Sequence, residues 1–206
     1  MDLSGIVDLV RRAVPGASID ALSPADMPTM SVDREHFIEV CRVVRDHAEL
    51  QFVFLADVTA VDRLPAEPRF ELVYHLACLG PHFLAAGASS AAPPQRLRMK
   101  VAVAADNAHM PTVTPVWPTA GWPEREVFDL FGIVFDGHPD LRRILMPEDW
   151  DGFPLRRDYP VQIRKDTASW SPLQLTPEEF ARSVREGREK AARQARPVGR
   201  PADARE

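Results

Sequence analysis

Two stretches near the start of the chain repeat apolar side chains at the spacing of an amphipathic helix. Over residues 3–14 the apolar positions recur every three or four residues, and Pro15 with Gly16 forms a helix-stopping signal. A second helix is predicted to follow Asp33, because aspartate is a favoured N-cap residue. Its apolar face is expected to comprise Phe37, Val40, Cys41, Val44 and Ala48.

Extended segments are expected between and after these helices, near residues 18–22, 28–32, 51–61, 70–79 and 97–103. The segment that begins at Gln51 is apolar on both faces at first, which predicts a central strand. The later two alternate apolar and polar residues, as strands with one solvated face do. Residues 80–95 are rich in Gly, Ser, Ala and Pro and predict an exposed loop. Helices followed by strands favour an α+β fold with helices packed on a largely antiparallel or mixed sheet.

The pattern changes after residue 105, where short apolar bursts between prolines replace the long periodic segments. We therefore divide the chain into an α+β domain over 1–105, a segment over 106–160 that packs on it, and a tail over 161–206. The tail is predicted to be extended and Pro-rich at first, and then helical over about 177–195. Thr176 supplies the N-cap of that helix and a proline its first position.

Composition narrows the function classes. Hydrophobic residues make up 45% of the 206 residues, enough for a core, and the net charge of −5 gives no reason to expect a nucleic-acid partner. The two cysteines, Cys41 and Cys78, are too few for a disulfide framework or a cluster site, and each lies in an apolar periodic segment. No signal peptide and no run of about 18 apolar residues is apparent, so we expect a protein that meets a membrane only through partners.

The most informative part of the sequence begins at Trp122. A short helix is predicted to start at Pro123 and to stop at Gly132. Within it, Arg125 and Asp129 have the i,i+4 spacing of an ion pair.

Two further local structures are predicted downstream. Asp140 is expected to cap a turn that carries Arg142 and Arg143. Prolines at both ends of residues 154–160 predict extended backbone there, because a proline disfavours helix in the residue before it.

This part of the chain resembles the signature of the 30 kDa subunit family of respiratory complex I, the C-type subunits of NADH-quinone oxidoreductase. The tokens are Glu-Arg-Glu-Val-x-Asp-x-Phe-Gly-Ile, Gly-His-Pro-Asp-Leu-Arg-Arg-Ile and Pro-Leu-Arg-Arg-Asp-Tyr-Pro, in that order. The residues that carry the resemblance are Glu124, Arg125, Glu126, Asp129, Gly132, His138, Pro139, Asp140, Arg142, Arg143, Arg156, Arg157, Asp158 and Tyr159. The resemblance implies that they fix the fold or face partners, and that none of them is catalytic.

The resemblance further implies a structural subunit of the peripheral arm of a proton-translocating NADH:quinone oxidoreductase, on the cytoplasmic side of the membrane. The partners would be the quinone-site and cluster-bearing subunits, and FMN, iron–sulfur clusters and quinone would be bound there, none by this chain. The sequence agrees, since it has no Cys-x-x-Cys, no Gly-rich phosphate loop and no dinucleotide fingerprint. The alternative is a homologous subunit of a membrane-bound hydrogenase or F420-type oxidoreductase.

Some of the same residues could carry chemistry by themselves, as in a stand-alone hydrolase or metal enzyme. Asp136, His138 and Asp140 are ligand types, although such a run is more often a turn with a capping aspartate. Glu124 and Glu126 could form an acid–base pair, but side chains at i and i+2 point to nearly opposite sides of a helix. A structural role is therefore favoured for all of them.

The four signature arginines also allow two interpretations. The pairs at 142–143 and 156–157 could bind phosphate or lipid headgroups, because the guanidinium fork matches such groups. Carboxylates are interleaved with them at Asp140, Glu148 and Asp158. Pairing with carboxylates of this chain or of a neighbour is therefore the preferred interpretation.

Overall fold

The computed structural model describes residues 2–22, 26–79 and 95–160, and residues 176, 178, 181, 182, 184 and 185. The chain divides into two compact units, Met1–Pro160 and Val161–Glu206. In the second unit, the described residues from 178 onward are helical, as predicted for the tail. The loop predicted at 80–95, apart from Gln95, and the extended stretch predicted at the start of the tail lie outside the described residues.

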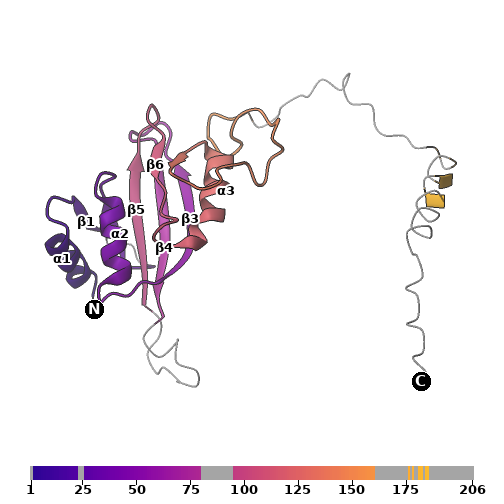
Figure 1. Ribbon diagram of the computed structural model, residues 1–206. Coiled ribbons are helices and arrows are strands. Elements are labelled where there is room, and N and C mark those ends of the chain that lie inside the picture. The colour runs from indigo at the N-terminus through magenta and orange to yellow at the C-terminus, as the bar shows by residue number, and fades with distance from the viewer. Residues whose placement is uncertain are drawn as a thin grey trace, which may run out of the picture. The chain divides into compact units, whose positions relative to one another are not determined.

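A five-stranded sheet forms the centre of the first unit (Figure 1). Its strands are β1 (Ile19–Leu22), β2 (Thr29–Val32), β3 (Phe54–Asp62), β4 (Phe70–Cys78) and β5 (Gln95–Val103). They lie in the order β1-β2-β5-β4-β3, with β2 and β5 parallel and the other neighbours antiparallel. The predicted α+β class with a mixed sheet is therefore confirmed.

The register of β4 and β5 separates an apolar face from a charged one. Tyr74 lies opposite Met99, and both side chains are fully buried. On the other face Lys100 Nζ lies 2.8 Å from Glu71 Oε1. Because side chains of a strand alternate between faces, the alternation seen in the sequence fixes which face is buried.

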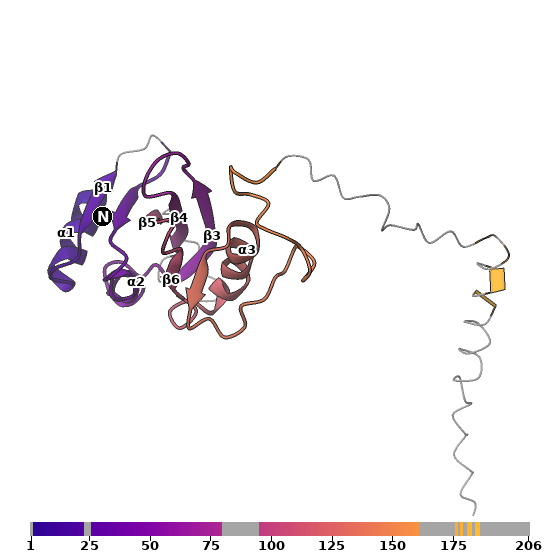
Figure 2. The same ribbon diagram turned by 90° about the horizontal axis from the view of Figure 1, so that it is seen from above.

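Three α-helices complete the core: α1 (Leu3–Ala13), α2 (Phe37–Asp46) and α3 (Gly121–Phe131). α2 and α3 lie on the same side of the sheet (Figure 2). Phe37 of α2 stacks against Tyr74 of β4, with ring centroids 4.7 Å apart, and α3 packs on β3. A parallel pair, β6 (His109–Pro111) and β7 (Val134–Asp136), and a short 3-10 helix (Pro118–Ala120) flank α3. One continuous hydrophobic core joins these elements to the sheet.

The two N-terminal helices form where predicted, but α2 starts later than expected. It begins at Phe37, and its N-cap residue is His36, which makes no side-chain cap. The Asp33 carboxylate instead accepts hydrogen bonds from the His36 and Ser18 amides, so it ties the preceding turn to β1. Ala48 lies beyond the helix end and is exposed, so it is not part of the buried face.

β3 lies at an edge of the sheet, and the central position predicted for it was wrong. Phe52 is buried before the strand begins, where its carbonyl accepts a hydrogen bond from Trp117 Nε1 at 3.1 Å. Val53 and Phe54 are both exposed. The apolar run thus combines two core residues, Phe52 and Leu55, with outward side chains at an edge that α3 partly covers.

The segment after residue 105 departs from the prediction at two points. α3 begins at Gly121, so Pro123 lies within its first turn, where a missing amide donor costs nothing. Residues 154–160 form consecutive turns, in which the Arg156 amide donates to Phe153 and the Tyr159 amide donates to Arg156. A proline restricts its own φ and the residue before it, which leaves the residues between Pro154 and Tyr159 free to turn.

Candidate functional site

Asp129, on α3, organises the loop that follows β7. Its Oδ2 accepts hydrogen bonds from the amides of Ile144, Leu145 and Met146 at 2.7–3.0 Å. Its Oδ1 lies 2.7 Å from Arg143 Nη1. The carboxylate is fully buried, and this loop has no strand or helix of its own to pair those amides. Asp129 therefore replaces the missing backbone partners.

The environment of Asp129 keeps it ionised. Burial alone would raise the pKa of this carboxyl, but the backbone donors and Arg143 lower it below its ordinary value. Arg143 also donates to the carbonyls of Trp150 and Gly152, so one guanidinium spans the loop.

The helical ion pair predicted between Arg125 and Asp129 does not form, because Arg143 occupies that carboxylate. Arg125 donates to the carbonyls of Arg142 and Arg143 instead, both at 3.0 Å, and lies over the Trp122 ring. Sequence spacing favoured the local pair, but the Arg143 side chain comes from a distant loop, is mostly buried, and satisfies several carbonyls as well as the carboxylate.

Glu124 and Glu126 point in different directions, as predicted. Glu124 is fully buried, and its carboxylate accepts from Thr112 Oγ1 at 2.5 Å and from the Val113 amide at 2.8 Å. Burial raises the pKa of Glu124 to about 7, although both hydrogen bonds act to lower it. Glu126 is exposed. The two glutamates therefore cannot serve one substrate.

The residues at 136–140 do not converge on a common point. His138 turns inward and lies 3.0 Å from the Gly121 carbonyl, while Asp136 and Asp140 are exposed. Asp140 pairs with Arg142 through two contacts of 2.6 and 2.8 Å and caps no turn bearing Arg143, contrary to the prediction. In the described ranges, no group of three or more His, Cys, Asp and Glu side chains could hold a metal ion.

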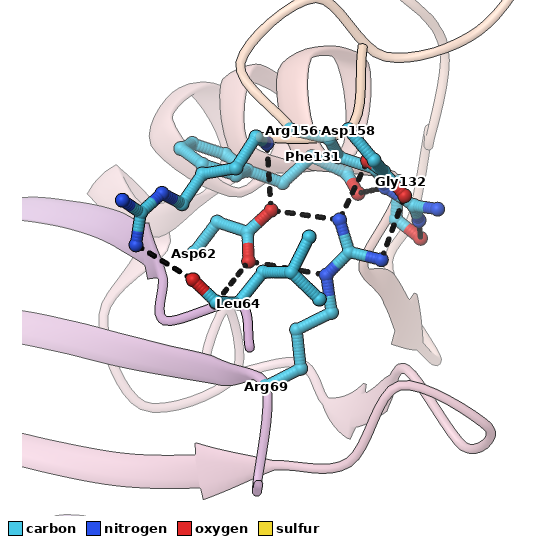
Figure 3. Close-up of polar contacts among 8 residues, drawn as sticks. Asp62, Leu64, Arg69, Phe131, Gly132, Arg156 and Asp158 are labelled. Carbon is cyan, nitrogen blue, oxygen red and sulfur yellow. Dashed lines mark hydrogen bonds and ion pairs between the residues drawn. The ribbon is translucent and has the colours of Figure 1, made fainter. Parts of the chain in front are cut away.

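A third buried carboxylate, that of Asp62, fixes the end of the first unit (Figure 3). Asp62, at the end of β3, accepts two hydrogen bonds from Arg69 at 3.1 and 2.8 Å, and others from the Leu64 and Arg157 amides. The opposite side of the Arg69 guanidinium binds both oxygens of Asp158 at 3.0 and 2.6 Å. Arg69 holds the pKa of Asp62 well below its ordinary value. One guanidinium thus joins the β3–β4 turn to a residue 89 positions away.

Within the chain, the two arginines before Asp158 bind carbonyls and not the predicted carboxylates; pairing with a carboxylate of a neighbour stays a prediction. Arg156 Nε lies 2.6 Å from the Phe131 carbonyl, and its guanidinium lies over the rings of Phe70 and Phe153. Arg157 Nη1 lies 2.7 Å from the Leu64 carbonyl. Arg156 therefore caps the end of α3, while Arg157 holds the β3–β4 turn.

Gly132 makes this cap possible. It ends α3 with φ +72°, as its position in the sequence predicted. A Cβ at this residue would lie 2.4 Å from Phe153 Cε2 and 2.6 Å from Arg156 Nη2. Only glycine allows both the left-handed backbone and this close approach.

Taken together, the buried carboxylates and the signature arginines bind backbone groups or each other. Tyr159 and Pro139 complete the turns, with the Tyr159 hydroxyl 3.2 Å from the Asp151 carbonyl. Such an arrangement braces the loops beside α3 and the β3–β4 turn. No helix within the described ranges is long and apolar enough to cross a membrane.

Comparison with known families agrees with this site. The model of the family described as "Respiratory-chain NADH dehydrogenase, 30 Kd subunit" matches residues 30–165, which include every signature residue. The chain belongs to this family. The match also covers β3 to β5 and all but the first residue of β2, so the family resemblance extends over most of the sheet as well as the signature.

Individual relatives of the 30 kDa family share much of the sequence. The C-type subunit of the NADH-quinone oxidoreductase of Saccharopolyspora erythraea is 47% identical over 155 residues, 74% of this chain and 57% of that protein. Its namesake in Roseiflexus sp. strain RS-1 is 41% identical over 161 residues, 78% of this chain and 86% of its own length. The chain thus spans little more than half of the first relative and most of the second.

Two solved structures resemble the fold. A trypsin-resistant fragment (1–134) of Nqo5 is 33% identical, with a TM-score of 0.50, and the match covers 68% of this chain and all of the fragment. A chain of the membrane-bound sulfane sulfur reductase, an archaeal respiratory membrane complex, is 23% identical with a TM-score of 0.60 over 84% of this chain and 94% of that one. The second likeness concerns the fold alone.

Several residues that hold these loops in place could not be found from the sequence. Asp62 and Arg69 lie outside the signature tokens. They pair across the β3–β4 turn, seven positions apart, and Arg69 also binds Asp158, 89 positions away, so no helical or strand spacing signals them. Phe153 directly precedes the last token and carries no charge, yet both Arg143 and Arg156 lie over its ring.

We predict that Arg69→Met lowers the free energy of unfolding by about 3–5 kcal/mol, because it leaves the Asp62 carboxylate buried and without its cation. Urea unfolding of the full chain measures the change. Arg63→Met is the matched control, since Arg63 is exposed and its partner Glu71 keeps Lys100. We expect that control to change stability by less than about 1 kcal/mol. If both variants lose the same free energy of unfolding, the buried pair contributes no more to stability than the exposed one.

A second prediction concerns Gly132. Gly132→Ala should lower the free energy of unfolding by about 1–3 kcal/mol more than Gly137→Ala does, because overpacking a core usually costs about that much. Gly137 has a similar φ of +80°, but a Cβ there would meet only Thr112 Cγ2 at 3.6 Å. The pair therefore separates the clash with Phe153 from backbone strain, and thermal unfolding of both variants measures the difference. A similar loss in both would contradict the clash.

Proposed function

We propose that the chain is a non-catalytic structural subunit of the peripheral arm of a proton-translocating NADH:quinone oxidoreductase. Electrons would pass from NADH through FMN and iron–sulfur clusters to quinone, all held by partner subunits. The chain would bind none of these cofactors and would position the quinone-site and cluster-bearing subunits. It would reach the cytoplasmic side of the membrane only through them.

One observation supports a structural role over a chemical one: apart from the exposed Glu126, the charged groups of the signature are engaged within the chain. Asp129, Arg143 and Arg156 each bind backbone groups of the loops beside α3. Asp158 pairs with Arg69. A protein whose characteristic charges brace its own loops has a rigid surface to offer to neighbours.

Three large apolar side chains stand on this braced surface. Trp122, Leu145 and Leu155 are 66%, 59% and 52% exposed. The Trp122 ring lies under the Arg125 guanidinium, the Leu145 amide is bound by Asp129, and the Leu155 amide donates to the Leu130 carbonyl. Their backbone is thus fixed before any partner arrives, which lowers the entropic cost of binding. Exposed Trp and Leu on a fixed frame favour protein docking.

The proposed function is tested by affinity purification of the tagged full chain from gently solubilised native membranes. We expect flavin-bearing, cluster-bearing and quinone-site subunits to co-purify with NADH:quinone activity. The chain should have no such activity after separation from them. Recovery of nickel-hydrogenase-like subunits without an NADH module, or an active isolated chain, would overturn the proposal.

The docking surface is tested by Trp122→Ala and Leu145→Ala. Because buried aromatic and apolar anchors contribute about 2 kcal/mol or more to an interface, we expect each variant to weaken recovery of partner subunits at least about tenfold. Stability of the isolated chain should change by less than about 1 kcal/mol, since both side chains are exposed. Leu22→Ala, at an exposed residue of β1, is the control and should keep full recovery. Normal recovery with both variants would exclude this surface.

A further inference from the structure

Glu124 is a buried carboxyl group with no cation in contact among the described residues. Its side chain is fully buried, and its hydrogen-bond donors are the Thr112 hydroxyl and the Val113 amide. Its neighbour in the core is His138, whose Nε2 lies 3.8 Å from Glu124 Oε2. Asp129 and Asp62, by contrast, each have an arginine. Removal from water without a counter-charge favours the protonated form of a carboxyl group.

The hydrogen bonds of His138 show that it does not supply the missing charge. The Asp140 amide donates to Nδ1 at 3.0 Å, so that nitrogen carries no proton. Nε2 lies 3.0 Å from the Gly121 carbonyl, to which it donates its single proton. Both nitrogens of the neutral ring are thus hydrogen-bonded. In a charged ring, the Nδ1–H group would face the Asp140 N–H group, and two donors cannot bind each other.

The remaining titratable groups near Glu124 are Cys41 of α2 and Tyr74 of β4. Burial raises the pKa of both well above their ordinary values, so both stay protonated and uncharged around neutral pH. Of the carboxyl, thiol and phenol groups of this cluster, Glu124 is therefore the one that changes charge there.

The Thr112 hydroxyl is placed to serve both protonation states of Glu124. It contacts Glu124 Oε2 at 2.5 Å and Thr114 Oγ1 at 3.0 Å, and it accepts from the Thr114 amide. When Glu124 is ionised, Thr112 donates its proton to the carboxylate. When Glu124 is protonated, the new O–H donates to Thr112 Oγ1, and the threonine proton turns to Thr114 Oγ1. Each heavy atom keeps its partners in both states.

We propose that Glu124 is a proton-binding site in the core, which takes up one proton and shares it with the Thr112 hydroxyl while the surrounding atoms stay in place. Burial raises the pKa of Glu124 to about 7, so uptake occurs near neutral pH. The proton comes from solvent, and the half-buried Thr114 lies at the outer end of the hydroxyl pair. The inference concerns this chain alone and does not depend on the proposed function.

Proton binding at Glu124 links stability to pH. The folded chain holds this proton more tightly than the unfolded chain, where the carboxyl has its ordinary pKa of 4.5. The added stability is therefore complete below pH 4.5 and is lost as the pH rises to about 7. Over that window the folding constant should fall by about two orders of magnitude from this group, since each unit of pKa difference is a factor of ten.

The test is an NMR titration of the full chain labelled with ¹³C at the glutamate carboxyl groups. In the wild type we expect one carboxyl resonance to titrate with a midpoint near pH 7 and to disappear in Glu124→Gln. Glu126→Gln, which removes the neighbouring exposed glutamate, should leave it unchanged. Thr112→Val should move the midpoint upward, because the hydroxyl bond lowers the pKa of Glu124. A purely structural Thr112 would not alter it.

Each outcome decides the proposal. If no glutamate titrates above about pH 6, or if the near-neutral resonance persists in Glu124→Gln, the site does not bind a proton as proposed. An unmoved midpoint in Thr112→Val would refute the shared proton. If Glu124→Gln fails to fold, the wild-type titration with the Thr112→Val and Glu126→Gln variants still decides, since assignment then rests on the Thr112-dependent shift.

Discussion

A buried carboxylate has to be matched by donors, and this requirement shapes most of the structure after β5. The loop that follows β7 contains little regular structure, so its amides need partners from elsewhere. Asp129 accepts three of them on one oxygen and binds Arg143 with the other. Removing either member of this pair would leave a charge buried alone, which costs far more than an exposed pair contributes. The loop is consequently fixed to α3.

The same principle applies at the end of β3, with the roles of the charges reversed. There a single guanidinium, that of Arg69, serves Asp62 on one side and Asp158 on the other. The arginines next to Asp158 donate to carbonyls at the end of α3 and in the β3–β4 turn. Arginine suits this task because its planar fork places several donors at fixed angles. Most of the signature charges thus serve the fold.

Glu124 differs from the other buried carboxylates because it has no arginine. Its hydrogen-bond partners are a hydroxyl and an amide, and both can stay hydrogen-bonded whether Glu124 is ionised or protonated. The remaining carboxylates stay ionised and hold loops through charge-assisted hydrogen bonds. The proposed proton-binding group thus lies near Cys41 of α2, Tyr74 of β4 and Thr112 in the segment after β6.

The sequence by itself determined the elements whose signals are local. The apolar spacing of α1 and α2, the alternation in β4 and β5 and the glycine after α3 appeared where predicted, because each depends on neighbours within a few residues. The family was also readable, since its tokens are contiguous. Tertiary structure alone decided that β3 is an edge strand, that Asp129 binds Arg143, and that Arg69 joins Asp62 to Asp158. Each of these depends on which segment of the folded chain lies against the strand or the buried charge, and local periodicity carries no information about that.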